Sequence, residues 1–138
     1  EKLIEDLKIK DYCKLDIKFI DHNDVKLYYS ASDVVILPYR KIYQSGVLMM
    51  SLCYKKPVIV SNLKSFHEIV DDQKTAIFFN SEDSSSLAKA VNDLINNDNL
   101  MSEIKKNAYK LMLEKYNWTQ LGKLTSDAYN KINYFYKK

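Results

Sequence analysis

The chain has 138 residues, of which 46% are hydrophobic and 28% are charged, and its formal net charge is +3. This balance is typical of a folded globular domain and excludes intrinsic disorder as the main state, because enough apolar surface is present to build a core. The weak, scattered positive charge gives no reason to expect a nucleic-acid partner. No apolar run approaches the roughly 18–20 residues that a membrane-spanning helix needs.

The counts of glycine, proline and cysteine narrow the class of fold. The chain has two glycines and two prolines, fewer than a barrel or sandwich with many tight hairpins requires. Its cysteines, Cys13 and Cys53, lie far apart in the sequence, so we expect neither a disulfide framework nor a metal site, and the reducing cytoplasm fits them best. No secretory signal is visible at Glu1, and the abrupt start indicates a piece of a longer protein.

Short strand-like runs alternate with longer helix-like stretches along the first part of the chain. The first predicted strand covers 15–20, of which 17–20 is expected to pair within the sheet. A turn at 21–24 follows it. The run 34–37 ends at Pro38 and is continuously apolar, as expected for a strand buried on both faces. Two further strands are predicted at 58–60 and 76–79.

Apolar residues at helical spacing predict helices between and after these strands. A short helix over 25–32 is expected to be capped by Asn23 or Asp24, and after the last strand the chain is expected to be entirely helical. The final helix is expected to start behind Asn117 and to bury Trp118 in the core. The other predicted helices lie within 4–9, 45–53, 65–70, 87–95 and 100–111.

Strands that alternate with helices are typical of β-α-β units, so the sequence predicts an α/β fold with a parallel sheet flanked by helices. Sheets of this kind bind ligands at the carboxyl ends of their strands, where loops lead into helix N-termini. The passage from Leu37 through Tyr39 and Arg40 to Ser45-Gly46 is such a place, because it leaves a buried strand and enters an apolar helix.

Ser45-Gly46 permits two interpretations from residue types alone. A helix start offers unpaired backbone N–H groups and the positive end of the helix dipole, which stabilise an anion such as a phosphate. Gly46 would let a phosphate oxygen approach closely, Ser45 would add a hydroxyl donor, and Arg40 would reach the same anion. Alternatively, Ser45 is simply an N-cap and Gly46 is a residue accommodated in the first turn.

Several motifs, taken in order, resemble the donor-binding half of glycosyltransferase family 4, the group 1 glycosyltransferases. A short helix ending in Ala31-Ser32-Asp33, a strand ending in Leu37-Pro38 and a strand start at Pro57-Val58-Ile59 each resemble an element of that family. The similarity runs from about residue 17 to residue 136. Further matching segments are 45–48, 67–72, 75–79, 83–98 and 116–119.

Members of this family have two Rossmann-like domains, with the active site in the cleft between them. The resemblance implies that residues 1–138 form a single, partial C-terminal Rossmann-like domain that binds the donor and ends in a helical tail. The acceptor would be held by an N-terminal domain that these residues do not include, so the fragment alone is expected to be inactive. Arg and Lys residues that grip the diphosphate in the family also lie outside this sequence.

The resemblance also implies an activity. The full-length enzyme would transfer a hexose or related sugar, with retention, from a nucleotide-sugar to a saccharide or lipid-linked acceptor in cell-surface polysaccharide or glycan synthesis. No metal and no other cofactor are implied, since the nucleotide-sugar is a substrate. The expected localisation is cytoplasmic, and peripheral association of the full-length enzyme with the inner face of the membrane fits such acceptors. The aromatic and basic residues 134–138 are a candidate for that contact, or for packing on the missing domain.

The resemblance places the nucleotide-sugar at the loop and helix start described above. His22 lies in the turn where the family places backbone contacts to the base, although a solvated turn histidine is an equally good interpretation. A pairing of His67 with Glu68 as acid and base is also possible, but a structural role for a helix-terminal glutamate is favoured. No catalytic residue is assigned. The expected donor-binding residues are Tyr39, Arg40, Gln44, Ser45, Gly46, Val47 and His22.

The sequence departs from the family pattern at informative positions. The family commonly has two glutamates, one near the sugar and one on the ribose, where this chain has Ile42 and Met50, and it has a glycine in place of Lys55. These differences are interpreted as those of a divergent enzyme. The alternative interpretation is a non-catalytic pseudoenzyme or partner-binding module. A flavodoxin-like signalling module is a third class, but the acidic cluster or Gly-rich phosphate loop that it requires is missing. The sugar, the base, the acceptor and the oligomeric state are left open.

Overall fold

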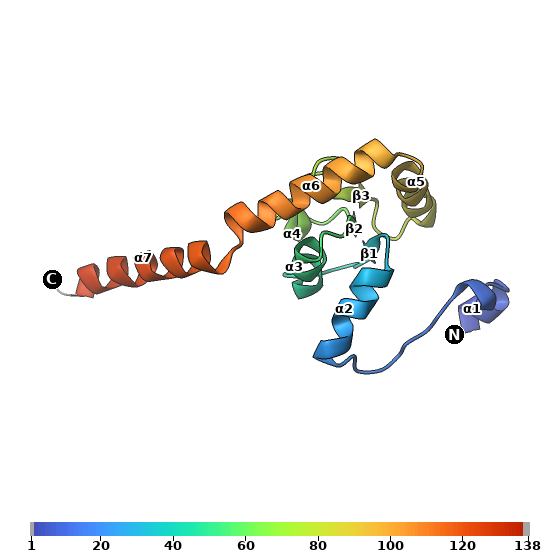
Figure 1. The fold of residues 1–138 in the computed structure, drawn as a ribbon, viewed down its shortest axis with the longest axis horizontal. Coiled ribbons are helices and arrows are strands. Elements are labelled where there is room, and N and C mark those ends of the chain that lie inside the picture. Colours follow the sequence, from blue (N-terminus) through green and yellow to red (C-terminus); the bar gives the residue numbers. More distant parts are fainter. Residues whose placement is uncertain (1, 137–138) are drawn as a thin grey trace.

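The computed structural model describes residues 2–136, with side chains described for residues 2–132. Figure 1 shows a central body built around a small sheet, from which an N-terminal segment and a long C-terminal helix extend. The elements in chain order are α1 (Lys2–Asp6), the 3-10 helix η1 (Lys10–Tyr12), α2 (His22–Ala31), β1 (Val35–Leu37), α3 (Gly46–Cys53), β2 (Val58–Ser61), α4 (Lys64–His67), β3 (Ile77–Phe79), α5 (Ser84–Ile95), α6 (Asp98–Lys115) and α7 (Trp118–Tyr136).

The three strands form one parallel sheet in the order β1-β2-β3. Ile59 on the central strand pairs with Ile36 on one side and with Ile77 on the other. All residues of β2 are buried, because the strand has a neighbour on each edge and helices on both faces. The α/β fold with a parallel sheet flanked by helices is therefore confirmed, as are the strands predicted at 34–37, 58–60 and 76–79.

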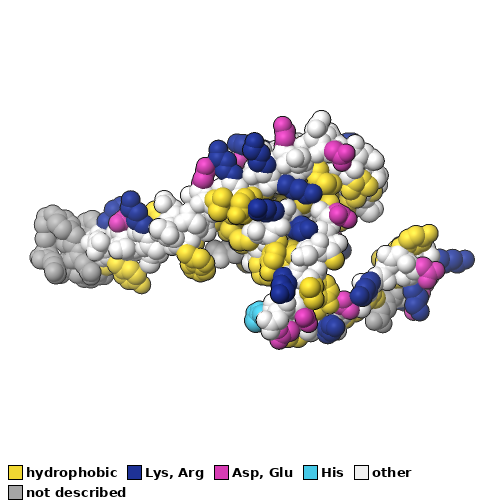
Figure 2. Space-filling model, in the orientation of Figure 1, with side chains coloured by type: hydrophobic (Ala, Val, Ile, Leu, Met, Phe, Trp, Pro, Cys, Tyr) yellow, Lys and Arg dark blue, Asp and Glu magenta, His cyan; other side chains and the backbone are white. Residues whose placement is uncertain are grey.

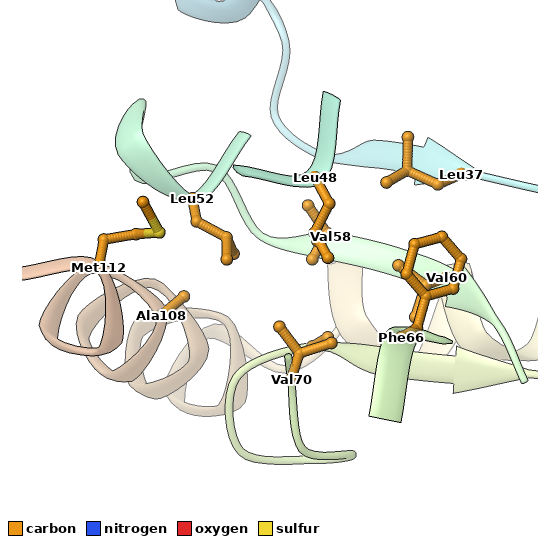
Figure 3. Packing of buried hydrophobic residues seen from close by; sticks show 10 residues of the cluster. Leu37, Leu48, Leu52, Val58, Val60, Phe66, Val70, Ala108 and Met112 are labelled. Atoms are coloured by element: carbon orange, nitrogen blue, oxygen red, sulfur yellow. The ribbon is translucent and has the colours of Figure 1, made fainter. Parts of the chain in front are cut away.

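The side chains of β2 alternate between two hydrophobic clusters, one on each face of the sheet. Val58 and Val60 point toward α3, α4 and the C-terminal half of α6 (Figure 3). Ile59 points to the opposite face, where α5 and the first half of α6 cover the sheet. The first cluster also contains Leu37, Leu48, Leu52, Phe66, Val70, Ala76, Ala108 and Met112, and the second contains Ile77, Phe79, Ala90, Leu94 and Ile104.

Most of the helices begin at a side-chain cap. Asp83, Asn97 and Asn117 accept hydrogen bonds from backbone N–H groups at the starts of α5, α6 and α7, which confirms the predicted cap at Asn117. For α2 the predicted cap is wrong. Asp21 caps this helix by accepting from the N–H of Asn23 across 2.9 Å, so the helix begins before both predicted cap residues.

The strand predicted over 17–20 does not form. Residues 13–21 form neither helix nor strand and bend at Lys18, and Ile17 and Phe19 are 79% and 84% exposed. A strand needs a neighbour that satisfies its backbone N–H and C=O groups, and the described residues provide none beside this segment. Figure 1 shows the segment crossing open space between α1 and α2. The alternation of apolar and charged residues in this segment is therefore not sufficient to predict a strand.

Helix α7 extends away from the sheet, and hydrophobic side chains follow one side of it (Figure 2). Trp118 is 87% exposed, so the expectation that it lies in the core is wrong. Helical spacing identified an apolar face but not what covers it. The predicted contact of residues 134–138 lies outside the residues whose side chains are described. Within residues 2–136, no helix combines the length and the apolar character needed to cross a membrane.

Candidate functional site

The loops that follow β1 and β2 enclose two adjoining cavities at the carboxyl edge of the sheet, which we call the carboxyl-edge groove. The cavities measure about 330 and 470 Å³ and share Tyr43, Ser65 and Glu68 in their walls. The smaller cavity is also lined by Arg40, Lys41, Ile42, Leu63 and Lys64. The larger is also lined by Gln44, Ser45, Gly46, Met49, Ile69 and Tyr116.

The N-terminus of α3 opens on the larger cavity. The hydroxyl oxygen of Ser45 accepts from the N–H of Leu48 across 3.1 Å, so the N-cap interpretation of this serine is confirmed. Within the described part of the chain, the amides of Gly46 and Val47 donate to no acceptor. A Cβ added to Gly46 would meet no atom within 4 Å beyond its own stretch of helix, so the space in front of this residue is open. This arrangement leaves donors and room for an anion.

The smaller cavity is predominantly basic. Arg40, Lys41 and Lys64 line it, whereas Glu68 is its one acidic lining residue. The side chain of Arg40 is 80% exposed and forms an ion pair with Glu82 from the turn after β3, with 3.0 Å between Arg40 Nε and Glu82 Oε1. Arg40 therefore lies at the groove as predicted, but its partner in this structure is a carboxylate of the chain itself.

Tyr39 is the first residue of the loop with a structural role. Its half-buried ring packs beside Phe66, with 6.2 Å between the ring centroids. Its backbone carbonyl accepts from the hydroxyls of Ser61 and Ser81, across 2.6 and 3.3 Å. The aromatic group belongs to the edge of the core rather than to the walls of the groove.

The other predicted donor-binding residues are not all brought together. Gln44, Ser45 and Gly46 line the larger cavity, and Val47 lies one residue further into α3, where its carbonyl accepts from Ser51. His22 is the first residue of α2, and Figure 1 shows this end of the helix pointing away from the sheet. His22 lines neither cavity of the groove.

The acid–base pair considered at His67 and Glu68 does not form in this arrangement. The imidazole of His67 instead shares a hydrogen bond with the side-chain amide oxygen of Asn62 across 2.7 Å and stacks on Phe78. Glu68 lines both cavities of the groove without it. The two side chains are adjacent in the sequence, but His67 contacts Asn62 and Phe78 whereas Glu68 lines the groove.

Ile42 and Met50 occupy the positions where the family commonly has glutamates, and they differ in environment. Ile42 is half-buried and packs against the core beneath the groove, whereas Met50 is 39% exposed on α3. Sequence reasoning did not identify the contributions of Ser65 and Tyr116 to the groove. They come from the segment after β2 and from the end of α6, and only the packing of these elements brings them together.

Metal ligation is a separate question. Among the residues that the structure describes, no group of three or more His, Cys, Asp or Glu side chains is placed to hold a metal ion. The donors at the groove are backbone amides, hydroxyls and cationic side chains, which suit an anionic group of a ligand.

A parallel sheet flanked by helices, with a basic groove and an open helix N-terminus at its carboxyl edge, defines a Rossmann-like α/β domain with donors for an anion at that edge. Residues 1–111 match the family model described as glycosyl transferases group 1, and the chain belongs to this family. A curated relative, an uncharacterized glycosyltransferase of Methanocaldococcus jannaschii, is 26% identical over 113 residues. That alignment covers 80% of this chain and 28% of the relative.

Solved structures share the fold. The sucrose-phosphate synthase of Thermosynechococcus elongatus superimposes with a TM-score of 0.85 at 21% identity, covering 95% of this chain and 33% of that one. HepE of Anabaena in complex with UDP gives a TM-score of 0.86 at 17% identity, covering 94% and 35%. The same protein is also described in complex with UDP-glucose. The chain thus spans about a third of the length of these proteins.

Proposed function

We propose that this chain is the donor-binding part of a retaining glycosyltransferase, and that the carboxyl-edge groove receives the diphosphate of a nucleotide-sugar. The observation that carries the proposal is the start of α3. The amides of Gly46 and Val47 have no acceptor within the described chain and open on a cavity of about 470 Å³. The family to which the chain belongs transfers sugars, and the start of α3 offers donors to an anion beside this cavity.

Charge and volume support the same assignment. Arg40, Lys41 and Lys64 concentrate positive charge in the adjoining cavity, which attracts a diphosphate. Cavities of a few hundred cubic ångströms are the usual size of sites for small ligands. The two cavities meet at Ser65 and Glu68, so the groove is continuous enough for a diphosphate and the sugar attached to it.

We propose a uridine nucleotide as the donor, because HepE, which shares this fold, is described in complex with UDP and with UDP-glucose. The acceptor would be a saccharide or a lipid-linked saccharide in the synthesis of a cell-surface polysaccharide. It would meet the donor through residues beyond this chain, on the cytoplasmic side of the membrane. Residues 1–138 alone should then bind the nucleotide without transferring the sugar.

A nucleotide titration tests the proposal. UDP, GDP and ADP are added separately to the labelled chain while the backbone amides of 45–48 are followed by NMR. UDP should shift the amides of Gly46 and Val47 at lower concentration than GDP or ADP. Arg40→Ala should weaken UDP binding by roughly 0.5–1.5 kcal/mol, the usual range for a hydrogen bond at an exposed site. Amides that do not move at millimolar nucleotide would contradict the proposal.

A second candidate rests on Ile42 and Met50. Ile42 has no acceptor for a hydrogen bond from a sugar or ribose hydroxyl, and Met50 has only its weakly accepting thioether sulfur. Their presence favours a non-catalytic domain that binds nucleotide-sugars and stabilises a partner enzyme. Assays of the longer protein separate the two candidates. Nucleotide-sugar binding with no hydrolysis and no transfer to any acceptor would support the non-catalytic domain, whereas turnover would exclude it.

A further inference from the structure

The turn after β3 contacts the first residues of the β1–α3 loop. The Ser81 hydroxyl donates to the carbonyl of Tyr39 across 3.3 Å, beside the 2.6 Å hydrogen bond from Ser61 to the same oxygen. In the next position along each segment, Glu82 pairs with Arg40 across 3.0 Å. Two consecutive residues of the turn therefore hold two consecutive residues of the loop.

The turn itself is well defined. The N–H of Asn80 donates to the hydroxyl of Ser86 across 2.9 Å, and the N–H of Asp83 donates to the carbonyl of Asn80 across 3.1 Å. Glu82 has a φ of 63°, a left-handed conformation that costs a non-glycine residue free energy and persists only where the surroundings impose it. Glu82 thus projects from a hydrogen-bonded turn, and its carboxylate pairs with Arg40.

The loop between Tyr39 and Ser45 has few other attachments near its start. Arg40, Lys41 and Tyr43 are exposed, whereas the far end of the loop is held by the Ser45 cap on α3. A long flexible side chain such as Arg40 loses rotamer entropy when it binds an anion, and a partner that restricts it beforehand lowers this cost.

We propose that Ser81 and Glu82 are positioning residues for the donor, which hold the start of the β1–α3 loop and the guanidinium of Arg40 at the carboxyl-edge groove. This inference rests on the proposed function and adds a further element to it. Ser81 acts on the backbone through Tyr39, and Glu82 acts on Arg40. Neither residue lines the groove, so both act through the residues that they hold.

The experiment compares the double variant Ser81→Ala/Glu82→Ala with the wild-type chain in two measurements. The NMR order parameters of the amides of 40–44 are measured without ligand, and the Kd for UDP is measured by titration calorimetry. The order parameters should fall, and UDP binding should weaken by about three- to tenfold, the size expected from losing an exposed hydrogen bond and ion pair. Adding Glu82→Ala to Arg40→Ala should weaken UDP binding no further, since the two residues act together.

Two controls separate positioning from general destabilisation. Glu82→Gln keeps a hydrogen-bond acceptor for Arg40 and should bind UDP more tightly than Glu82→Ala does, and Glu103→Ala, on the exposed surface of α6, should change neither measurement. Unchanged order parameters in the double variant would overturn the proposal, and so would lower order parameters with unchanged UDP affinity. If the wild-type chain binds no nucleotide, the proposed function fails, whereas the order parameters still decide whether the turn holds the loop.

Discussion

The ammonium nitrogen of Lys55 lies 4.1 Å from the centroid of the Tyr109 ring, so a cation–π contact joins the end of α3 to α6. Lys55 has a φ of 57°. Its N–H donates to the carbonyl of Leu52, and the N–H of Lys56 donates to that of Ser51. These hydrogen bonds form a Schellman motif, whose left-handed position usually holds glycine. The glycine that the family commonly has at the position of Lys55 would adopt this left-handed conformation without steric cost.

Lys55→Gly should raise the free energy of unfolding by roughly 0.5–1 kcal/mol. A lysine in the left-handed conformation costs about 1–2 kcal/mol, which glycine avoids. Loss of the cation–π contact offsets about 0.5–1 kcal/mol of this gain in stability. Lys55→Ala keeps the backbone cost and loses the contact, so it should lower the stability. Urea unfolding of both variants measures these changes, and a glycine variant less stable than the alanine variant would contradict the explanation.

Lys56 ties the end of α2 to the body. Its ammonium donates to the carbonyl of Ser32 across 2.8 Å and lies 3.4 Å from that of Ser30. Lys56→Met should lower the free energy of unfolding by about 1 kcal/mol, because carbonyls at a helix C-terminus lose a charged donor. The matched control is Lys26→Met, on the exposed surface of α2, which should change the stability little. Equal effects of the two variants in urea unfolding would show that the contact is not stabilising.

Substitution of Gly46 separates binding from stability. Gly46→Ala should leave the stability equal or raise it by about 0.4–1 kcal/mol, because the backbone there is not left-handed and the added carbon meets nothing. Binding of UDP should nevertheless weaken, and Gly46→Val should weaken it more, since the side chain occupies the space that a phosphate oxygen would enter. Thermal unfolding and UDP titration are measured for each variant.

The control for that substitution is Gly122→Ala. This glycine lies within α7 and an added carbon there also meets nothing within 4 Å. The variant should gain stability from helix propensity without any change in UDP affinity. Unaltered UDP binding in both Gly46 variants would contradict the assignment of α3 to the diphosphate.

Tyr28 provides a pH-dependent prediction. Its hydroxyl donates to Asp16 across 2.8 Å, and this hydrogen bond, with smaller effects of burial and of the charges of Asp16 and Asp24, raises the pKa of Tyr28 above its ordinary value of 10.0. Any stabilisation from the contact is therefore complete below pH 10 and is lost as the pH rises through the raised pKa. NMR titration of ¹³C-labelled tyrosine should show Tyr28 ionising above the ordinary tyrosine pKa of 10.0. Asp16→Asn should lower the pKa of Tyr28, and an unchanged value would contradict the contact.

Local sequence patterns predicted the structure correctly where the tertiary structure provides the neighbouring strands and helices that a buried element needs. The Val-Ile-Val run became a strand buried on both faces, because sheet neighbours and helices cover it. Ser45 and Asn117 became N-caps, because capping depends on residues three positions away in the chain. The apolar alternation of 15–20 and the apolar face at Trp118 specify surfaces to be covered, and nothing in the described chain covers them. The same patterns therefore failed there.

The sequence by itself determined the parallel α/β fold and the family, since these depend on periodicity, caps and ordered motifs, and it predicts a ligand site at the passage from Leu37 to Gly46. Tertiary structure alone decided which side chains meet there. It brought Glu68 and Tyr116 to the groove from distant elements and placed His22 away from it. It also paired Arg40 with Glu82. Contacts between residues far apart in sequence arise from how the helices pack on the sheet, and no local pattern encodes them.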